Sequence, residues 1–477
     1  MKKSILVFAL ALLTFIKNYA QNDKAIYSII DANAQQLAQK SGAYSVSIGI
    51  LKDGKTYTKH FGEVDKGKRN KANDDTYFEI ASVTKLFTGQ LLAKAVLDGK
   101  ISLEDDIRKY LKNDYPNLEY NGTPIKIKNV ISYTTALPRT LPDDEKLYQN
   151  LTDETPFLIN KLAADYSKEQ FFKDLKNVKL DTIPGTKYKY SNLSLELTGV
   201  ILENIYGKSI ETIFDENIFS GLGMKHTKFT LDKNESLANG YCCGNHRLMP
   251  HFNSNLWSST GAKTKSSLGD LMKFMKEELN PQNKIAQESQ KNIEGSKEKW
   301  HGYFWDDYYV TEKGKSGFKH GGAYGTQTMF MIYPELNAGI CMIINISNPE
   351  TLGILHSTAT NLIEDLTNTS DKKQVYGYSV RGNNAVFSYA HPEKMDSKLI
   401  HSVSVAGSFN DWNPGNKEYQ MKKKGENLFE LEVPLIKFEK GKIYSFKFVL
   451  NKESWMTTPK NASNIDGTED NNLVFML

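Results

Sequence analysis

The sequence is poor in cysteine and lacks the common metal-binding patterns. Of 477 residues only three are cysteine, and two of them, Cys242 and Cys243, are neighbours. There is no Cys-x-x-Cys pair and no His-Glu-x-x-His pattern, which are usual signatures of zinc sites. An odd number of cysteines also gives no disulfide framework. We therefore expect neither a metal ion nor an organic cofactor.

An excess of charge of one sign is also missing. The chain has 60 Lys and Arg against 56 Asp and Glu, a net charge of +4, and 39% of its residues are hydrophobic. This composition is ordinary for a globular protein and excludes a disordered one. It gives no argument for a nucleic-acid partner. The densest basic stretch, at 66–71, lies between two strand-like runs and is interpreted as a solvated loop.

Long apolar runs are absent after the first twenty residues. Lys2 and Lys3 precede an apolar run from Ile5 to Ile16, and a small residue, Ala20, follows. This order is typical of a secretory signal peptide over 1–20, because the run is short for a membrane span. A retained anchor helix is the alternative. The sequence thus predicts export to the periplasm or medium after cleavage near Ala20, with no stable membrane span.

Strand patterns at both ends of a long region enclose helical patterns. Helices are expected at 26–40, 86–97, 193–205, 268–278 and 349–366, and strands at 46–50, 57–61, 326–333 and 339–345. Asp53-Gly54 is a hairpin signal between the first two strands. This arrangement predicts one mixed domain, over 21–367, whose sheet is built from both of its ends.

Composition changes after this region. Residues 368–374 are polar and without periodicity, which predicts a linker. Short alternating strands follow from 375 to 477, for example at 402–405, 429–433 and 444–449, with no helical pattern. We expect a second, all-β domain there, of the sandwich kind.

The search for catalytic groups begins with another absence, since the chain has no Gly-x-Ser-x-Gly elbow. A Ser and a Lys three residues apart on a helix are an alternative, because both side chains then lie on one face. This pattern occurs at Ser82–Lys85, Ser296–Lys299, Ser316–Lys319 and Ser370–Lys373. Only Ser82 opens a helix with a buried face; Ser316 is interpreted as part of a Gly-rich loop. An ordinary capped helix is the alternative for Ser82.

Two further elements favour acyl transfer. Tyr190-Ser191-Asn192 precedes the helical pattern at 193–205, and a tyrosine there can hold a proton between nucleophile and leaving group. His320-Gly321-Gly322 is followed by Ala323 and a strand. A Gly-rich strand lets a substrate lie against the backbone and offers an N–H to a developing oxyanion. Each element alone is a weak signal.

Together and in this order, the three elements resemble the serine β-lactamase family, which includes class C enzymes, D-Ala-D-Ala peptidases and esterases. The resemblance covers about residues 25–366. It implies a β-lactamase/transpeptidase-like α/β (α+β) domain with an antiparallel sheet flanked by helices. It also implies roles: Ser82 as nucleophile, Lys85 as activating amine, Tyr190 as general acid/base and Asn192 as substrate-orienting residue. His320, Gly322 and Ala323 would form the substrate-binding edge, with the Ser82 and Ala323 N–H groups as oxyanion hole. Whether Lys85 or Tyr190 is the general base stays open.

Two positions depart from the family pattern. Tyr133 stands in Ser-Tyr-Thr-Thr-Ala-Leu, where relatives carry Ser-His-Thr-Ser-Gly-Leu, and we interpret this as a change of packing. Gly321 replaces the threonine that helps bind a substrate carboxylate. The prediction is an exported hydrolase of an ester or amide, either a carboxylesterase or a D-Ala-D-Ala peptidase. A β-lactamase and a non-catalytic peptidoglycan- or glucan-binding sensor are the alternatives.

The stretch Gly407-Ser-Phe-Asn-Asp-Trp-Asn-Pro414 resembles a different family. It is similar to the glycogen-binding module of the AMP-activated kinase β subunit, which implies an immunoglobulin-like sandwich. The resemblance implies glycan contacts by Trp412, Lys447, Trp455 and Asn471, because indole faces stack on sugar rings. An α-glucan or a cell-wall glycan is the expected partner. A module used only for packing is the alternative.

Overall fold

The computed structural model describes residues 23–476 except 150–151, 244, 257, 368–375, 391–399, 426–427, 440–441, 460–461, 463 and 469. The expected signal peptide at 1–20 and linker at 368–374 lie outside the described residues. No helix in the described part of the chain is long and apolar enough to cross a membrane. The chain forms two compact units, 1–363 and 364–477.

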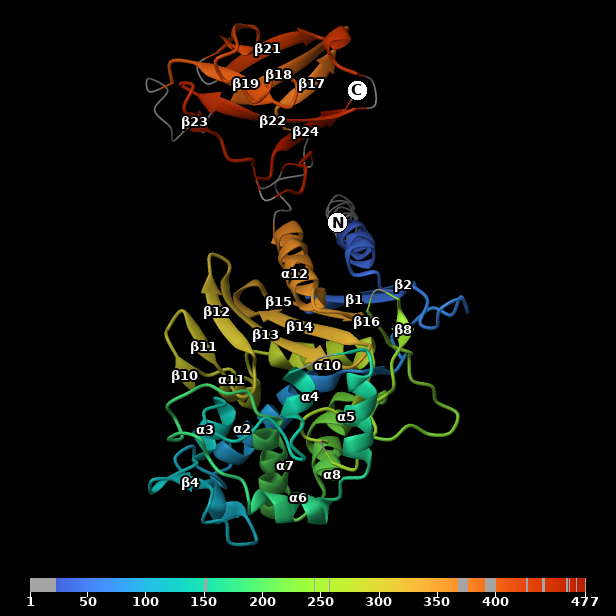
Figure 1. Ribbon diagram of the computed structural model, residues 1–477, viewed down its shortest axis with the longest axis vertical. Coiled ribbons are helices and arrows are strands. Elements are labelled where there is room, and N and C mark those ends of the chain that lie inside the picture. Colours follow the sequence, from blue (N-terminus) through green and yellow to red (C-terminus); the bar gives the residue numbers. More distant parts are fainter. Residues whose placement is uncertain are drawn as a thin grey trace, which may run out of the picture. The chain divides into compact units, whose positions relative to one another are not determined.

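The first unit is built on one eight-stranded sheet (Figure 1), with the order β10-β11-β12-β13-β14-β15-β1-β2. In this order the strands span Glu294–Gly295, Lys299–His301, Asp307–Thr311, Gly314–Gly322, Gln327–Tyr333, Ala338–Ile344, Ser45–Lys52 and Lys55–Gly62. Every neighbouring pair is antiparallel. The sheet thus has the antiparallel character that the sequence predicts.

The two ends of the unit meet within this sheet, next to its edge strand β2. β1 pairs with β15, with Val46 opposite Ile344, and with β2 through the turn at Asp53-Gly54. Both turn residues have positive φ, as a two-residue hairpin requires. The expectation of a sheet built from both ends is therefore confirmed. β1 is buried along almost its whole length rather than on one face.

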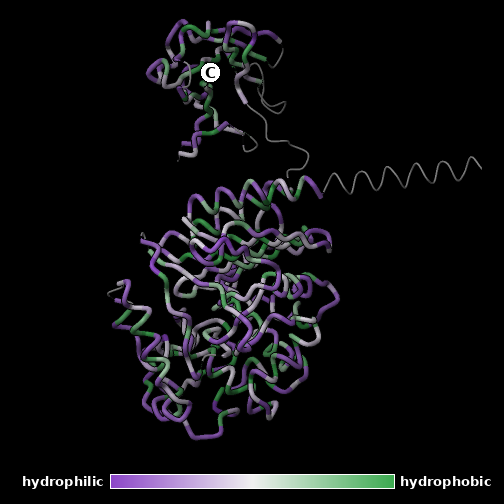
Figure 2. The backbone as a smooth tube through the Cα atoms, turned by 90° about the vertical axis from the view of Figure 1, so that its right-hand side faces the viewer, coloured by the Kyte–Doolittle hydropathy of each residue, from purple (hydrophilic) through white to green (hydrophobic). Residues whose placement is uncertain are grey.

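Helices on both faces of the sheet explain this burial. Figure 1 shows α12 (Thr351–Thr367) and the helix over 23–41 on one side of the sheet, and α10 (Leu268–Glu278) on the other. α10 lies so close to β1 that a Cβ on Gly49 would meet Met272 Sδ at 2.5 Å. In Figure 2 the segments in the interior of this unit are largely hydrophobic and the peripheral loops hydrophilic.

The rest of the hydrophobic core of the first unit lies in a helical region. α2 spans Thr84–Leu97 and α7 spans Asn192–Tyr206, close to the bounds that the hydrophobic periodicity predicts. α7 begins at the N-cap Ser191, whose Oγ accepts the Ser194 N–H, and ends at Gly207 in the left-handed region. The remaining helices that bear on the site are α3 (Ile127–Ile131), α4 (Glu145–Gln149), α5 (Thr155–Ala164) and α8 (Ile210–Phe214).

The second unit contains two antiparallel sheets. One has the order β17-β18-β21-β20, and the other has β22 between β19 and both β23 and β24. These strands span Tyr378–Arg381, Asn384–Ala390, Leu428–Pro434, Lys422–Lys423, Ile443–Leu450, Val403–Gly407, Ser454–Trp455 and Leu473–Met476. Phe387, Phe446 and Phe475 are at most 2% exposed in its core. The region is all-β, as expected; its immunoglobulin-like topology stays a prediction.

Candidate active site

Ser82 lies in a 3₁₀ turn, Ala81–Val83, that leads into α2. Ala81 has φ +43°, which is unusual for a residue with a side chain. The turn is enclosed by two glycines: a Cβ on Gly261 would lie 1.9 Å from the Ala81 carbonyl oxygen, and one on Gly321 would lie 2.1 Å from the Ile80 oxygen. The Ser82 N–H lies at the start of a helix, where backbone N–H groups have no intrahelical acceptor.

Lys85 follows one helical turn later and points back at Ser82. Its Nζ is 2.8 Å from Ser82 Oγ and 2.7 Å from the Thr260 carbonyl oxygen. The side chain is 1% exposed. Burial, together with the Lys319 ammonium, holds the pKa of Lys85 well below its ordinary value, because the charged amine loses its hydration. A neutral Lys85 can accept the Ser82 proton while donating to Thr260.

Tyr190 precedes α7 and completes the cluster. Its hydroxyl is 3.1 Å from Ser82 Oγ. Burial raises the pKa of Tyr190 above its ordinary value, so the phenol keeps its proton. Asn192, the first residue of α7, lines the same cavity. The structure thus brings together Ser82, Lys85, Tyr190 and Asn192, as the sequence predicts.

The end of β13 supplies the opposite edge of the site. His320, Gly322 and Ala323 all line the cavity that contains Ser82. His320 Nε2 is 2.6 Å from Gln327 Oε1, while Gln327 Nε2 donates to the Ala323 carbonyl and to Ser347 Oγ. Because the amide N–H groups of Gln327 are used there, its oxygen faces His320, and His320 donates from Nε2.

The backbone N–H of Ala323 has a partner in this structure. It donates to the Thr326 carbonyl oxygen at 2.8 Å, which closes the turn between β13 and β14. The expected oxyanion role therefore requires this N–H to be shared with, or released to, a substrate oxygen. The oxyanion hole stays a prediction at Ala323.

Lys319 and Asp306 also belong to the site, although the sequence interpretation placed neither of them there. Lys319 is fully buried, and its Nζ is 2.5 Å from Asp306 Oδ1. Asp306 Oδ2 accepts the His320 N–H at 2.8 Å. Lys319 lies on β13, so the interpretation of Ser316–Lys319 as a loop was wrong.

Tyr133 contacts the catalytic ring directly. Its ring stacks on that of Tyr190, with centroids 4.9 Å apart, and it is 1% exposed. Lys319 Nζ lies 5.9 Å from the centroids of both rings. The departure at Tyr133 is therefore a change of packing, as expected, and it lies directly against the ring of Tyr190.

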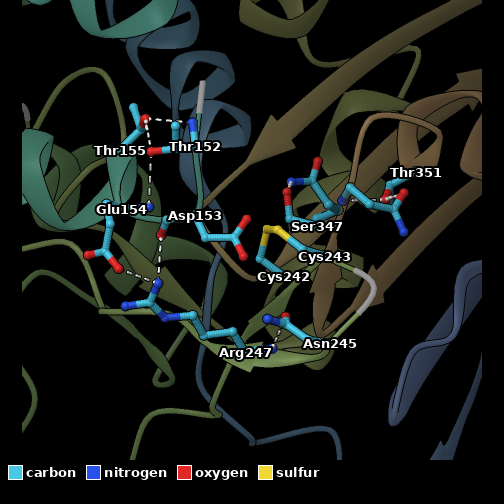
Figure 3. The surroundings of a disulfide bond; sticks show 12 residues. Thr152, Asp153, Glu154, Thr155, Cys242, Cys243, Asn245, Arg247, Ser347 and Thr351 are labelled. Atoms are coloured by element: carbon cyan, nitrogen blue, oxygen red, sulfur yellow. Dashed lines mark hydrogen bonds and ion pairs between the residues drawn. A yellow bond between two sulfur atoms is a disulfide. The ribbon is translucent and has the colours of Figure 1, made fainter. Parts of the chain in front are cut away.

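The site opens into a cavity of 710 Å³. Part of its wall is a disulfide between the neighbours Cys242 and Cys243, which the cysteine count did not predict (Figure 3). It lies at the end of β7 (Tyr241–Cys242), in the turn toward β8 (Arg247–Leu248). Cys341 is the remaining cysteine and is buried in β15, as expected. Within the described residues, no cluster of His, Cys, Asp and Glu could hold a metal ion.

Two of the predicted glycan residues, Trp412 and Trp455, are neighbours in the second unit. The rings of Trp412 and Trp455 have centroids 6.2 Å apart, and Trp455 is 44% exposed. Trp455 pairs with Val449 across β22 and β23, so Lys447, two residues along, shares its face of the sheet. Asn471 is exposed and has φ +45°.

Comparison with known proteins assigns the first unit to a family. The family model described as Beta-lactamase matches residues 30–364. Protein flp of Staphylococcus aureus (strain MRSA252) is 26% identical over 342 residues, which are 70% of this chain and 66% of that protein. The chain thus matches about two thirds of the length of that relative. The D-alanyl-D-alanine-carboxypeptidase/endopeptidase AmpH of Escherichia coli (strain K12) is 27% identical, over 66% of this chain and 83% of AmpH.

A solved structure, the beta-lactamase/D-alanine carboxypeptidase from Yersinia pestis complexed with citrate, has the same fold. It superposes with a TM-score of 0.60 at 23% identity and covers 72% of this chain and 98% of the other. The family match spans well over half of the chain and contains the whole Ser82, Lys85 and Tyr190 cluster. The chain belongs to the beta-lactamase family and is a serine hydrolase of that family.

Proposed function

We propose that the protein hydrolyses an ester or an amide through an acyl-enzyme on Ser82, as a carboxylesterase or a D-Ala-D-Ala peptidase does. The observation that carries this proposal is the pair of contacts at Ser82 Oγ, to Lys85 Nζ at 2.8 Å and to Tyr190 OH at 3.1 Å. They place a proton acceptor and a proton donor at the nucleophile, which is the arrangement that acyl transfer needs.

The electrostatics favour Lys85 as the base. Its neutral amine takes the proton of Ser82 as Oγ bonds to the carbonyl carbon. Tyr190 donates its proton to the leaving oxygen or nitrogen as that bond breaks, and Lys85 returns a proton to the phenolate. Water then attacks the acyl carbon by the same path, which frees Ser82 and the acid. Depressed lysine and raised tyrosine pKa values suit these roles.

The environment of Gly321 supports an ester or a loosely held peptide rather than a β-lactam. A side chain there would collide with the Ile80 carbonyl, so no hydroxyl is available for a substrate carboxylate at this position. A β-lactamase is the second candidate, and the match of residues 30–364 to the family model described as Beta-lactamase favours it.

The test is labelling followed by a substrate screen. We expect a fluorophosphonate or fluorescent penicillin to label the wild type and not Ser82→Ala. Hydrolysis of p-nitrophenyl esters, D-Ala-D-Ala peptides and nitrocefin then ranks the substrate classes. Ser296→Ala, in the exposed Ser-x-x-Lys match at 296–299, is the control and should label normally. Absence of any Ser82-dependent adduct would instead support a binding sensor.

The second unit is proposed to bind an α-glucan or a cell-wall glycan through Trp412 and Trp455. The support is the pair of neighbouring indoles, of which Trp455 is exposed and Trp412 is half-buried. Trp412→Ala should be lost from insoluble starch that retains the wild type. Ile436→Ala changes an apolar side chain that is 94% exposed elsewhere in this unit and should be retained. Equal retention of Trp412→Ala and wild type rejects the glucan platform.

We also propose export, from the signal-like residues 1–20. Mass spectrometry of the protein recovered from the periplasm or the medium should show a chain that starts at Gln21. A chain that keeps Lys2 and Lys3 contradicts cleavage near Ala20.

A further inference from the structure

Gln327 is a buried polar residue of the active-site cavity to which the proposed hydrolysis gives no role. It is the first residue of β14, lies opposite Gly322 of β13 and is 6% exposed. It lines the same cavity as Ser82. A buried amide is costly unless its hydrogen bonds are satisfied, so its partners indicate what it holds in place.

The amide of Gln327 contacts three groups at the substrate-binding edge. Its Oε1 accepts from His320 Nε2 at 2.6 Å. Its Nε2 donates to the Ala323 carbonyl oxygen at 3.1 Å and to Ser347 Oγ at 2.7 Å. His320 lies in β13, Ala323 in the turn that follows and Ser347 in β16 (Ile346–Ser347), and all three line the cavity. One side chain thus joins three segments of the cavity wall.

The turn after β13 is rich in glycine. Gly322 precedes Ala323, and Gly325 follows it by two residues. Glycine has more backbone conformations open to it than other residues, so such a segment depends on its contacts for a fixed geometry. The Ala323 N–H donates to the Thr326 carbonyl, and the Ala323 carbonyl accepts from Gln327. Gln327 therefore holds the side of Ala323 that the hydrogen bond of the turn itself does not hold.

Gln327 also fixes the form of His320. Because the amide oxygen of Gln327 is the acceptor, the Nε2 atom of His320 carries a proton. Burial lowers the pKa of His320, while the Asp306 carboxylate and the hydrogen bond to Gln327 act in the opposite direction. Lys319 on β13 and His356 on α12 lower this pKa further. The form expected near neutral pH is therefore the neutral ring with its proton on Nε2.

We propose that Gln327 is a positioning residue of the hydrolase: its amide holds His320 and Ala323 so that the Ala323 N–H meets the oxyanion that forms at the reacting carbonyl. This inference rests on the proposed function, and in particular on the predicted oxyanion role of Ala323. An oxyanion donor acts on charge that develops only in the transition state. Displacing this donor should thus lower kcat and leave KM nearly unchanged.

The first test is the hydrolysis of p-nitrophenyl acetate by the full chain with Gln327→Met. Methionine is similar in length to glutamine but forms none of the three hydrogen bonds. Removal of an oxyanion donor costs about 10²- to 10³-fold in kcat, and here the donor is displaced rather than removed. We expect kcat to fall by about 10- to 100-fold, with KM changed by less than about threefold.

Gln90→Met is the matched control. Gln90, on α2, is 7% exposed and donates to Glu278 Oε1 at 2.7 Å, and it does not line the cavity. This variant also loses a buried hydrogen bond, so its thermal midpoint should fall as well, but its kcat should stay within about threefold of the wild type. An unchanged kcat in Gln327→Met overturns the proposal. An equal loss of kcat in both variants also overturns it, because Gln327 would then act through stability alone.

A second measurement does not require Gln327→Met to fold. Nitrogen NMR of labelled histidine rings, with His320 identified by the signal missing in His320→Gln, should show a proton on Nε2 in the wild type. Gln327→Glu keeps an oxygen beside this ring and should raise the pH at which it titrates, because a carboxylate favours the imidazolium. A wild-type ring without a proton on Nε2, or an unchanged titration in Gln327→Glu, overturns the proposal.

The same experiments separate the role of Gln327 from the hydrolase itself. If cleavage and labelling depend on Ser82 but Gln327→Met keeps the wild-type kcat, the positioning role fails and the hydrolase stands. If neither cleavage nor labelling depends on Ser82, the proposed function fails, and the positioning role fails with it.

Discussion

Lys85 contacts two oxygen atoms, the Ser82 hydroxyl and the Thr260 carbonyl, and is 1% exposed. No carboxylate is within ion-pair distance of its amine in the described structure. A lysine in such surroundings is easier to keep neutral than charged. At the scale of single residues, the proposed mechanism depends on that preference.

The first prediction concerns pH. In the proposed mechanism the neutral amine is the base, so kcat/KM should rise as pH increases through the lowered pKa of Lys85. The rise should be complete well below 10.5, the ordinary value for lysine, and Tyr190 should not limit activity below 10. The measurement is kcat/KM for a p-nitroanilide between about pH 5 and 9. A rise still in progress at the upper end contradicts a neutral Lys85.

A substitution tests the same residue. Lys85→Ala should lower kcat/KM by about 10²- to 10⁴-fold, the usual contribution of a general base. Lys94→Ala, in the last turn of the same helix, removes an exposed amine that pairs with Asp98. That control should keep its activity, and comparable losses in both variants would indicate a structural effect on α2 instead.

The pair of Lys319 and Asp306 gives the second residue-scale prediction. Lys319→Met leaves Asp306 without its cation and should cost about 3–5 kcal/mol of unfolding free energy. It also removes one of the two main causes of the lowered pKa of Lys85, so the rise of kcat/KM should move to higher pH. Denaturant unfolding and the pH profile measure the two effects.

A double variant separates electrostatics from packing. Lys319→Met with Asp306→Asn removes both charges and keeps a side-chain oxygen that can accept the His320 N–H, so it should recover much of the lost stability. If Lys319→Met alone leaves stability and the pH profile unchanged, the ion pair does not position the catalytic groups.

At the scale of elements, the site depends on how closely β13 approaches the turn that carries Ser82. Gly321→Ala would place a Cβ 2.1 Å from the Ile80 carbonyl oxygen, and backbone must move to relieve it. We expect a loss of about 1–3 kcal/mol in unfolding free energy, together with a loss of activity. Gly322→Ala is the control for stability, because its Cβ would meet only side-chain atoms, at 3.3 Å or more.

The elements also show what the sequence could and could not predict. Ser82 and Lys85 share a helix, and Tyr190 precedes one, so local spacing is enough to single them out. Asp306 and Lys319 meet only because β12 and β13 are paired in this register, with Asp307 opposite Phe318. No pattern in the local sequence predicts such a pairing of strands. The close approach of Gly321 to the Ile80 carbonyl is likewise a contact between residues over two hundred positions apart in the chain.

Cysteine counting failed for a different reason. It treats disulfides as links between distant segments, and so gives no place to a bond between neighbours such as Cys242 and Cys243. That bond constrains one turn at the cavity wall and closes no loop of the chain. Helix bounds, by contrast, were predictable within a few residues for α7 and α10, because each has an apolar period and begins at a serine N-cap. α2 is buried on almost all sides and has no side-chain cap, so its run of apolar residues, rather than a period, indicates the helix.

At the scale of the whole molecule, the chain has two hydrophobic cores, one in each compact unit. Domains with their own cores can in principle fold alone. The division falls within α12, however, whose later residue Leu366 is still only 4% exposed. A cut at the division itself would therefore shorten a helix that covers the sheet of the first unit.

The last prediction follows from that detail. A chain of residues 21–367 keeps α12 complete and should retain kcat/KM on soluble substrates within about twofold of the full chain, because the cavity is lined entirely by the first unit. A chain of 21–363 loses Leu366 and should unfold at lower temperature. Retention on insoluble glycan should be lost in both. Loss of activity in 21–367, with its thermal midpoint unchanged, would mean that the second unit contributes to catalysis.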